Sequence, residues 1–177
     1  MDEGARWSRR LPASRWLFDS GLALVATGVS TAMFISIPIA RGQPRGTLVL
    51  GYALVLLHTL PLAARRRFPL AVLATSVASG LAFAALGLPP EILGPAILVA
   101  VYSVAAYGDR WVALAGLAVA EAGLAAVQLT PGKIGVQTLV VNMGVVAATW
   151  LLGQFAHNYR AYAARLEERT AELERAR

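Results

Sequence analysis

Long apolar stretches dominate this chain, and short polar breaks separate them. A helix that crosses a bilayer needs about 20 predominantly apolar residues. Six stretches approach that length, and they are residues 16–40, 47–64, 69–88, 92–107, 111–130 and 134–156. The breaks carry the Gly, Pro and charged residues that are typical of turns. The pattern therefore predicts an all-α membrane protein, a six-transmembrane-helix bundle with short loops and antiparallel neighbouring helices.

The composition agrees with this interpretation. Hydrophobic residues make up 57% of the 177 residues and charged residues 15%, and the mean hydropathy is +0.59. So few polar side chains cannot coat a soluble globule of this length. A net charge of +6 would suggest nucleic acid in a soluble protein, but here the basic residues flank apolar stretches, where they set membrane orientation. We therefore expect the lipid bilayer as a partner and no nucleic acid.

The distribution of Lys and Arg between alternate loops predicts the orientation of the bundle. Of the 16 basic residues, only Arg41, Arg45 and Lys133 lie in the first, third and fifth loops. Because strongly basic loops stay in the cytoplasm, we expect both termini to be cytoplasmic in a multi-pass protein of the cell membrane. The expected parts are a basic N-terminal segment (1–15), a six-helix transmembrane domain (16–156) and a juxtamembrane coiled-coil linker (157–177).

The last apolar stretch continues into a charged segment, with no Gly or Pro after Gly153. Two columns of a heptad repeat follow, with Tyr159, Leu166 and Leu173 at position d and Ala156, Ala163 and Thr170 at position a. Arg and Glu fill most of the remaining positions, as in a coiled coil. The pattern favours a dimeric coiled coil of marginal stability, with the d column as its seam, over a single solvated juxtamembrane helix.

Two polar residues fall near the middle of predicted spans. Glu121 lies in the fifth span, where an ionised carboxylate is costly unless it is paired or reached by water. Asn142 lies at a similar depth in the sixth span and could hydrogen-bond to it. Such pairs most often hold helices together, and we favour that role over the alternative, a proton or cation sensor.

Asp19 and His58 form a second polar pair, because their depths in the first and second spans are comparable. A carboxylate beside an imidazole would make a contact that responds to pH. The alternative, which we favour, places Asp19 in headgroup water and leaves His58 to cap a polar pocket.

Two further patterns concern the second loop and the fifth span. Arg65, Arg66 and Arg67 are a topology determinant, and they could also bind anionic lipid headgroups at about 1 kcal/mol for each basic residue. On the fifth span, small residues recur at helical spacing, at Ala113, Gly116, Ala120 and Gly123. This stripe predicts close approach of another helix.

Three segments of the chain resemble a known family. They are LLHTLPLAARRRFPLAVLATSVASG (56–80), YSVAAYGDRWVALAGLAVA (102–120) and WLLGQFAHNYRAYAARLEERTAELERAR (150–177). They look like the N-terminal membrane sensor region of actinobacterial two-component sensor histidine kinases. The resemblance implies a homodimer in which the membrane bundle biases a cytoplasmic autokinase, which then phosphorylates a response regulator. The linker would be the start of the dimerisation and kinase module.

In that family, the catalytic parts would follow Arg177. The phosphoacceptor His and the ATP lid do not occur in this sequence, and His58 and His157 do not match the phosphoacceptor motif. Motifs of nucleotide-binding loops, zinc proteases and serine hydrolases are also missing, and there is no Cys. We therefore expect no catalytic, cofactor-binding or metal-binding residues here. ATP and Mg would belong to the kinase module.

Two other functions are compatible with the residues. A small multi-span transporter or channel would use Glu121, Asn142 and Gln128 to line its path, although the chain shows neither interrupted helices nor a repeat. A membrane scaffold would instead dock a partner through the coiled coil.

Overall fold

The computed structural model describes residues 11–36, 44–128 and 136–176. Its helices are α2 (Leu11–Ser36), α4 (Arg45–Thr59), α5 (Pro69–Ala85), α6 (Gly94–Tyr107), α7 (Arg110–Gln128) and α8 (Val136–Ala176). Two 3₁₀-helices join them, η1 (Leu60–Ala64) directly after α4 and η2 (Pro90–Leu93) directly before α6. No strand occurs in the described ranges, so the predicted all-α class is confirmed.

Five helical stretches in the described part of the chain are long and apolar enough to cross a membrane. They are Leu17–Ser36, Arg45–Ala64, Pro90–Tyr107, Arg110–Gln128 and Val136–Ala176. The remaining helix, α5, is apolar but has 17 residues, fewer than the roughly 20 of a full span. The chain is a membrane protein with five candidate spans and one shorter apolar helix, where the pattern predicted six spans.

A tight turn ends α5 before the predicted boundary at residue 88. Gly87 has a φ of +70°, a left-handed conformation that Gly adopts without steric cost. Pro89 and Pro90 follow, and the chain returns through η2 before α6 begins. The predicted boundaries at residues 40, 130 and 134 lie outside the described residues.

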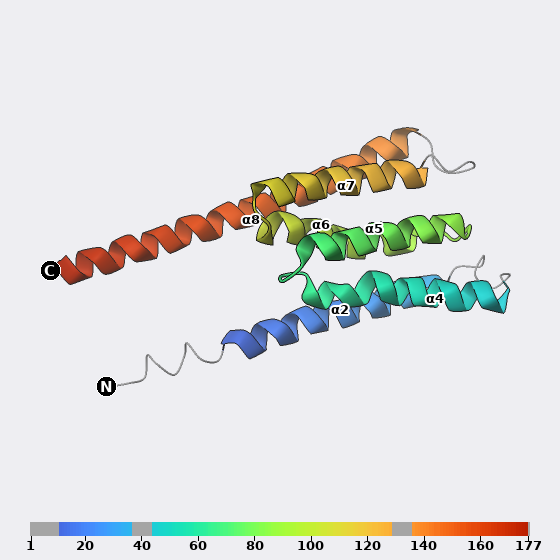
Figure 1. Cartoon of the computed structure of the whole chain (residues 1–177), viewed down its shortest axis with the longest axis horizontal. Coiled ribbons are helices and arrows are strands. Elements are labelled where there is room, and N and C mark those ends of the chain that lie inside the picture. The colour runs from blue at the N-terminus through green and yellow to red at the C-terminus, as the bar shows by residue number, and fades with distance from the viewer. Residues whose placement is uncertain (1–10, 37–43, 129–135, 177) are drawn as a thin grey trace.

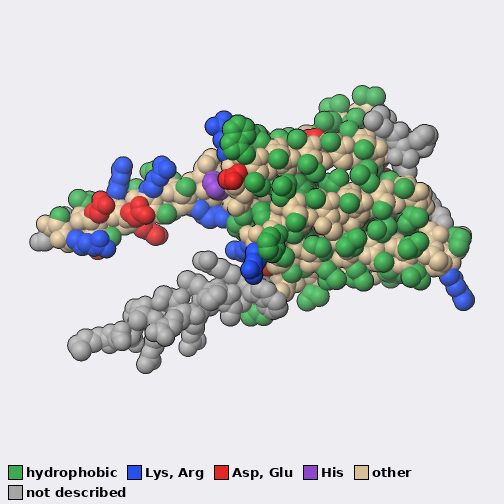
Figure 2. Space-filling view, in the orientation of Figure 1, with side chains coloured by type: hydrophobic (Ala, Val, Ile, Leu, Met, Phe, Trp, Pro, Cys, Tyr) green, Lys and Arg blue, Asp and Glu red, His purple; other side chains and the backbone are tan. Residues whose placement is uncertain are grey.

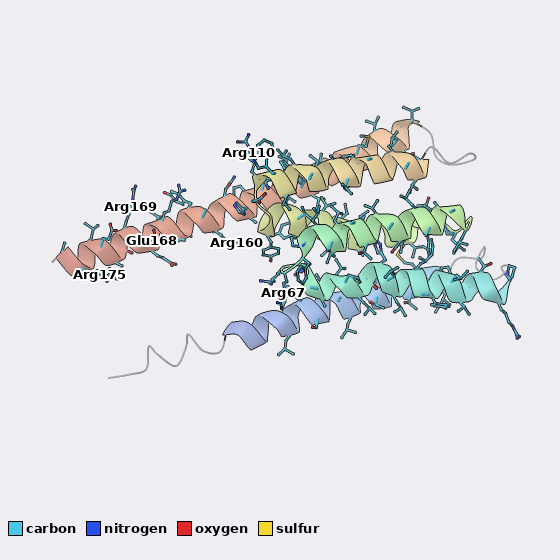
Figure 3. All side chains as sticks on the ribbon, in the orientation of Figure 1. Arg67, Arg110, Arg160, Glu168, Arg169 and Arg175 are labelled. Atoms are coloured by element: carbon cyan, nitrogen blue, oxygen red, sulfur yellow. The ribbon has the colours of Figure 1, made fainter. Side chains whose placement is uncertain are left out.

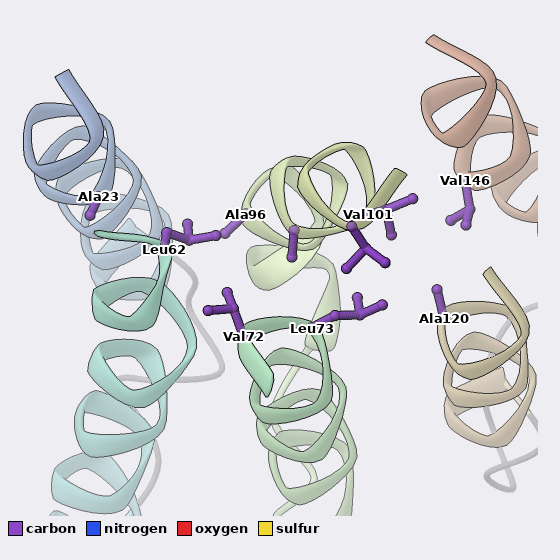
Figure 4. Close-up of a cluster of buried hydrophobic side chains, with 10 residues drawn as sticks. Ala23, Leu62, Val72, Leu73, Ala96, Val101, Ala120 and Val146 are labelled. Atoms are coloured by element: carbon purple, nitrogen blue, oxygen red, sulfur yellow. The ribbon is translucent and has the colours of Figure 1, made fainter. Parts of the chain in front are cut away.

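The helices form two rows when the bundle is viewed along its length (Figure 4). One row contains α2, α6 and α8, and the other contains α4 with η1, α5 and α7. The start of α2 and the end of α8 lie on the same side of the molecule (Figure 1). We call that side the tail end, because α8 extends there far beyond the other helices.

Two buried clusters occupy the interior of the bundle. The larger one joins η1, α5 and α6 through Leu62, Val72, Leu73, Val101 and Val104, and extends to Ala120 and Val146 on α7 and α8 (Figure 4). The smaller one joins the other ends of α2, α4 and α5 to η2 through Phe34, Val55, Phe83, Leu88 and Ile92. Because lipid tails are as apolar as these side chains, the clusters stabilise the bundle through close packing.

Small residues let neighbouring helices approach closely. All four members of the predicted stripe on α7 are buried, at Ala113, Gly116, Ala120 and Gly123. A Cβ atom on either glycine would overlap a valine, because Gly116 packs on Val104 and Gly123 on Val77. The predicted close-packing face is therefore present.

Gly153 plays the same part on α8. A Cβ atom there would lie 2.6 Å from the Cβ of Ala105 and 2.7 Å from the carbonyl oxygen of Tyr102. No side chain fits at that distance, and one of the two neighbours is backbone. Glycine at this position sets how closely α8 approaches the end of α6.

The outer surface of the bundle is apolar, and the charges gather at the tail end. Hydrophobic side chains cover the face of the bundle in Figure 2, whereas Lys, Arg, Asp and Glu cluster on α8 beyond it and where the bundle ends. Large apolar side chains such as Leu24, Leu57 and Leu152 are more than half exposed. An apolar exterior with a polar end is the surface expected of a protein embedded in lipid.

Gly153→Ala should lower the free energy of unfolding by about 1–3 kcal/mol, because the added methyl group pushes α8 away from α6. The matched control is Gly144→Ala on the same helix, where a Cβ atom meets nothing within 4 Å. That substitution should be neutral or stabilising by up to about 1 kcal/mol, since Ala favours helix over Gly. Denaturation in mild detergent measures both values. Equal effects of the two substitutions would contradict the assigned contact.

Candidate functional site

A buried ion-pair cluster ties α2 to the residues that follow η1. The Nη2 and Nε atoms of Arg65 lie 2.7 and 3.1 Å from Oδ1 of Asp19, and Arg66 pairs with the other carboxylate oxygen. Asp19 is 4% exposed and Arg65 5% exposed. Each buried charge is therefore neutralised, and removing one partner would leave the other unpaired.

The local sequence places the arginines where Asp19 can reach them. Pro61 stands in the first turn of η1, where its fixed φ favours a helical start. The tighter 3₁₀ turn then leads to Arg65 and Arg66. Phe68, the residue before Pro69, has an extended φ of −134°, as the following proline requires, and α5 begins there.

This arrangement corrects two predictions. Arg65 does not face headgroups, because it is buried on Asp19, whereas Arg67 is exposed and points from the tail end in Figure 3. Asp19 neither contacts His58 nor lies in headgroup water. The sequence does not show which arginine lies beside Asp19, and without that partner a carboxylate one turn inside a predicted span is expected to face solvent.

Tyr107, the last residue of α6, connects the cluster to α8. The guanidinium carbon of Arg66 lies 5.2 Å from the centroid of its ring, and that of Arg160 lies 4.8 Å from the same centroid. Both distances fall within the range of cation–π attraction. The ring thus joins Arg66, which is bound to Asp19, to the first part of α8 outside the bundle.

Side chains of α8 also bind the backbone of α6 and α7. Trp150 Nε1 and Gln154 Nε2 each donate a hydrogen bond of 2.8 Å, to the carbonyl oxygens of Ala113 and Ala105. His157 Nδ1 lies 3.4 Å from the carbonyl oxygen of Ala106. The last carbonyls of a helix have no partner within it, so α8 satisfies the end of α6.

Sequence reasoning did not find this junction between α8 and the end of α6. One signal was available, because residues 150, 154 and 157 are spaced four and three apart and therefore share one face of a helix. All three carry ring or amide nitrogens. Nothing local to the sequence indicates that the acceptors are backbone carbonyls of α6 and α7.

Beyond the junction, α8 carries an exposed apolar stripe. The predicted seam residues are 64% (Tyr159), 44% (Leu166) and 66% (Leu173) exposed. Phe155 and Tyr162 are also exposed and extend the stripe at heptad spacing. They are larger than the alanines assigned to position a in the sequence. Charged residues such as Glu168, Arg169 and Arg175 lie along the same part of α8 (Figure 3).

A cavity of about 260 Å³ lies between α5, α6, α7 and α8. Its lining is mostly apolar, with five polar side chains from different elements, namely His58, Ser76, Glu91, Gln128 and Asn142. His58 is fully buried. Its ring nitrogens lie 3.1 Å from the carbonyl oxygen of Ser76 and 3.0 Å from that of Leu93. Because a neutral imidazole has one N–H, one of these two backbone carbonyls accepts a hydrogen bond from His58.

The other predicted polar pair is not formed. Glu121 makes no hydrogen bond to Asn142, and its Oε2 atom is buried without a partner among the described residues. Asn142 lines the cavity, but Glu121 does not. Similar depth on two neighbouring spans is not enough to predict a hydrogen bond between two side chains. The rotation of each helix about its axis decides which side chains meet.

The model of a family described as a domain of unknown function (DUF7134) matches residues 5–160. The matched region contains the cavity and the junction, including Arg160, and stops before Leu166 and Leu173. No curated protein and no solved structure matches the chain.

Asp19→Asn should lower the free energy of unfolding by about 3 kcal/mol, because it leaves the buried guanidinium of Arg65 without a counter-charge. The matched control is Arg67→Gln, an exposed position in the same loop, which should change stability by less than about 0.5 kcal/mol. Replacing the pair together, as Asp19→Leu with Arg65→Met, should recover most of the loss. Thermal unfolding in mild detergent reports all three. A loss for Asp19→Asn no larger than for Arg67→Gln would contradict the assignment.

Proposed function

The chain belongs to the family described as a domain of unknown function, DUF7134, and we propose that it is the membrane-embedded input domain of a two-component sensor histidine kinase. In this proposal, the bundle senses a stimulus at or within the bilayer, and α8 transmits the change to an autokinase on the cytoplasmic side. Both termini are cytoplasmic. ATP, Mg and the response regulator interact with the kinase module and not with these residues.

The observation that carries the proposal is the continuity of α8. It runs for 41 residues from Val136 to Ala176, about 60 Å at the rise of an α-helix. The hydrocarbon core of a bilayer is only about 30 Å thick. One unbroken helix therefore packs in the bundle and also extends far outside it, so a shift or rotation inside the membrane reaches its distal end.

The contacts at the tail end support transmission because they link α2, the loop after η1 and α6 to α8. Asp19 on α2 holds Arg66, Arg66 contacts Tyr107 at the end of α6, and Tyr107 contacts Arg160. Gly153 holds α8 against α6 about two turns before Arg160. A movement of α2 or α6 is thus coupled to α8 at the point where it leaves the bundle.

The exposed stripe supports a homodimer. Burying one large apolar side chain contributes about 1.5–3 kcal/mol, and the stripe contains five such side chains at heptad spacing. Two parallel copies of α8 would bury these residues against each other as a coiled coil. Parallel alignment follows because both copies leave the same face of the membrane.

A membrane scaffold is the second candidate, and the same stripe favours it. A helix from another protein could cover the stripe in place of a second copy of α8. The transporter alternative has less support. Gln128 and Asn142 do line the cavity, but Glu121 does not, so the three residues assigned to a path do not share one wall.

Cysteine crosslinking tests the dimer. Leu166→Cys and Leu173→Cys should each form disulfide-linked dimers in oxidised membranes, because position d residues of a parallel coiled coil face each other across the seam. The control positions are Glu168 and Arg175, two residues further along and off the seam. Crosslinking that is equal at seam and control positions, or absent at both seam positions, would overturn the dimer.

A fusion tests the input role. The whole chain is joined in heptad frame to the dimerisation and ATP-binding parts of a histidine kinase, and autophosphorylation is measured in nanodiscs. Inserting four residues after Ala163 should change autophosphorylation several-fold, because the insertion rotates the distal helix relative to the bundle. Inserting seven residues restores the heptad and should restore the original rate.

Two results would contradict the input role. One is a rate that the four-residue insertion leaves unchanged. The other is a rate that stays the same after Asp19→Asn and Arg66→Gln, two changes that interrupt the path from α2 to Tyr107, in protein that remains folded and dimeric. Either result would leave the scaffold as the better candidate.

A further inference from the structure

We propose that the cavity between α5, α6, α7 and α8 binds a small single-chain amphiphile, with an apolar chain inside the bundle and a primary ammonium head at the mouth. The binding does not depend on the proposed input role. It is argued from the volume of the cavity and the chemistry of its two ends.

The volume sets the size of the ligand. The cavity holds about 260 Å³, more than an apolar cavity of about 150 Å³ that takes benzene and less than the 300–1,000 Å³ of sites for drug-sized molecules. A molecule of about ten non-hydrogen atoms fits this range. A phospholipid with two acyl chains does not. Side chains such as Val77, Ile97, Leu124 and Val146 form most of the wall, which suits an alkyl chain.

The polar groups nearest the tail end are covered by the backbone of the protein, and the one N–H of a neutral His58 ring donates to one of two carbonyls there. Both ring nitrogens of His58 face backbone carbonyls. The hydroxyl of Ser76 lies 3.4 Å from the carbonyl oxygen of His58. These groups therefore offer little to a ligand, and this end of the cavity accepts the apolar end of the chain.

The free polar groups lie toward the opposite end, and they are mostly acceptors. Gln128 is the last residue of α7, and its Oε1 atom is buried without a hydrogen-bond partner among the described residues. Glu91 in η2 lines the same cavity, is exposed and forms no ion pair within the described ranges. Among the described residues, no Lys or Arg lines the cavity. An unpaired carbonyl oxygen and a carboxylate that line the same cavity together favour a cationic N–H donor.

Two glycines keep the space open. Gly80 and Gly94 line the cavity, and a Cβ atom on either would meet nothing within 4 Å. At Gly116 and Gly123 the opposite holds, because valines fill the space there. Gly80 thus borders unfilled volume in the middle of a helix, and a larger side chain at residue 80 would extend into the ligand's place.

Binding of octylamine to the whole chain in phosphatidylcholine nanodiscs tests the proposal, with equilibrium dialysis as the measurement and protein-free discs as the background. Octylamine should bind saturably and about tenfold more tightly than octanoate, because a charge-assisted hydrogen bond contributes about that factor. Glu91→Gln and Gln128→Leu should each remove most of this preference. Gly80→Leu should abolish saturable binding.

The matched control is Gly28→Leu on α2, which also meets open space but does not line the cavity, and it should bind octylamine as the unchanged protein does. Saturable binding that survives Gly80→Leu in folded protein would overturn the site. Equal affinity for octylamine and octanoate would overturn the assigned head group. Thermal unfolding of each variant confirms that a loss of binding is not a loss of fold.

Discussion

The ion pair between Asp19 and Arg65 is the interaction on which the tail end of the bundle depends. It holds α2 to the loop after η1 and fixes Arg66 on the same carboxylate. From there, Arg66 reaches Tyr107, and Tyr107 reaches Arg160 on α8. Charges buried at this depth are tolerated only as a pair. The contact that stabilises the bundle is therefore also the first step of the path that leads out of it.

Close packing and backbone hydrogen bonds set the position of α8. Gly153 removes the side chain that would separate α8 from α6. Gln154 binds a carbonyl at the end of α6 that would otherwise lack a partner, and Trp150 binds the carbonyl of Ala113 on α7. Lipid provides no hydrophobic force between helices, so contacts of this kind decide helix placement. Along its exposed part α8 makes no such contacts with the other described residues, and its apolar stripe is left for a second helix. The cavity lies between α5, α6, α7 and α8, where Gly80 and Gly94 face unfilled space instead of a neighbouring helix.

Much of the fold could be predicted from the chain, and less of the site. Each predicted apolar stretch contains a helix, and the small-residue face of α7 is buried as expected. The pairs Asp19 with His58 and Glu121 with Asn142 were inferred from depth alone, and neither contact exists. Arg65 was assigned to the membrane surface because it stands in an arginine run, and only its neighbour Asp19 shows why it differs from Arg67.

The sequence by itself determined where helices form, that the helical stretches other than α5 are long enough for a membrane span and that α8 continues past the bundle, because these properties depend on local length, apolarity and the absence of helix breakers. The early end of α5 before Gly87 was not predicted. The tertiary structure alone decided which polar groups meet. Successive side chains of an α-helix point about 100° apart. Which polar side chains become partners therefore depends on how each helix is rotated and packed against the others. Asp19, Tyr107 and Gln154 acquire their roles there, and the cavity between four helices exists only once those helices are packed.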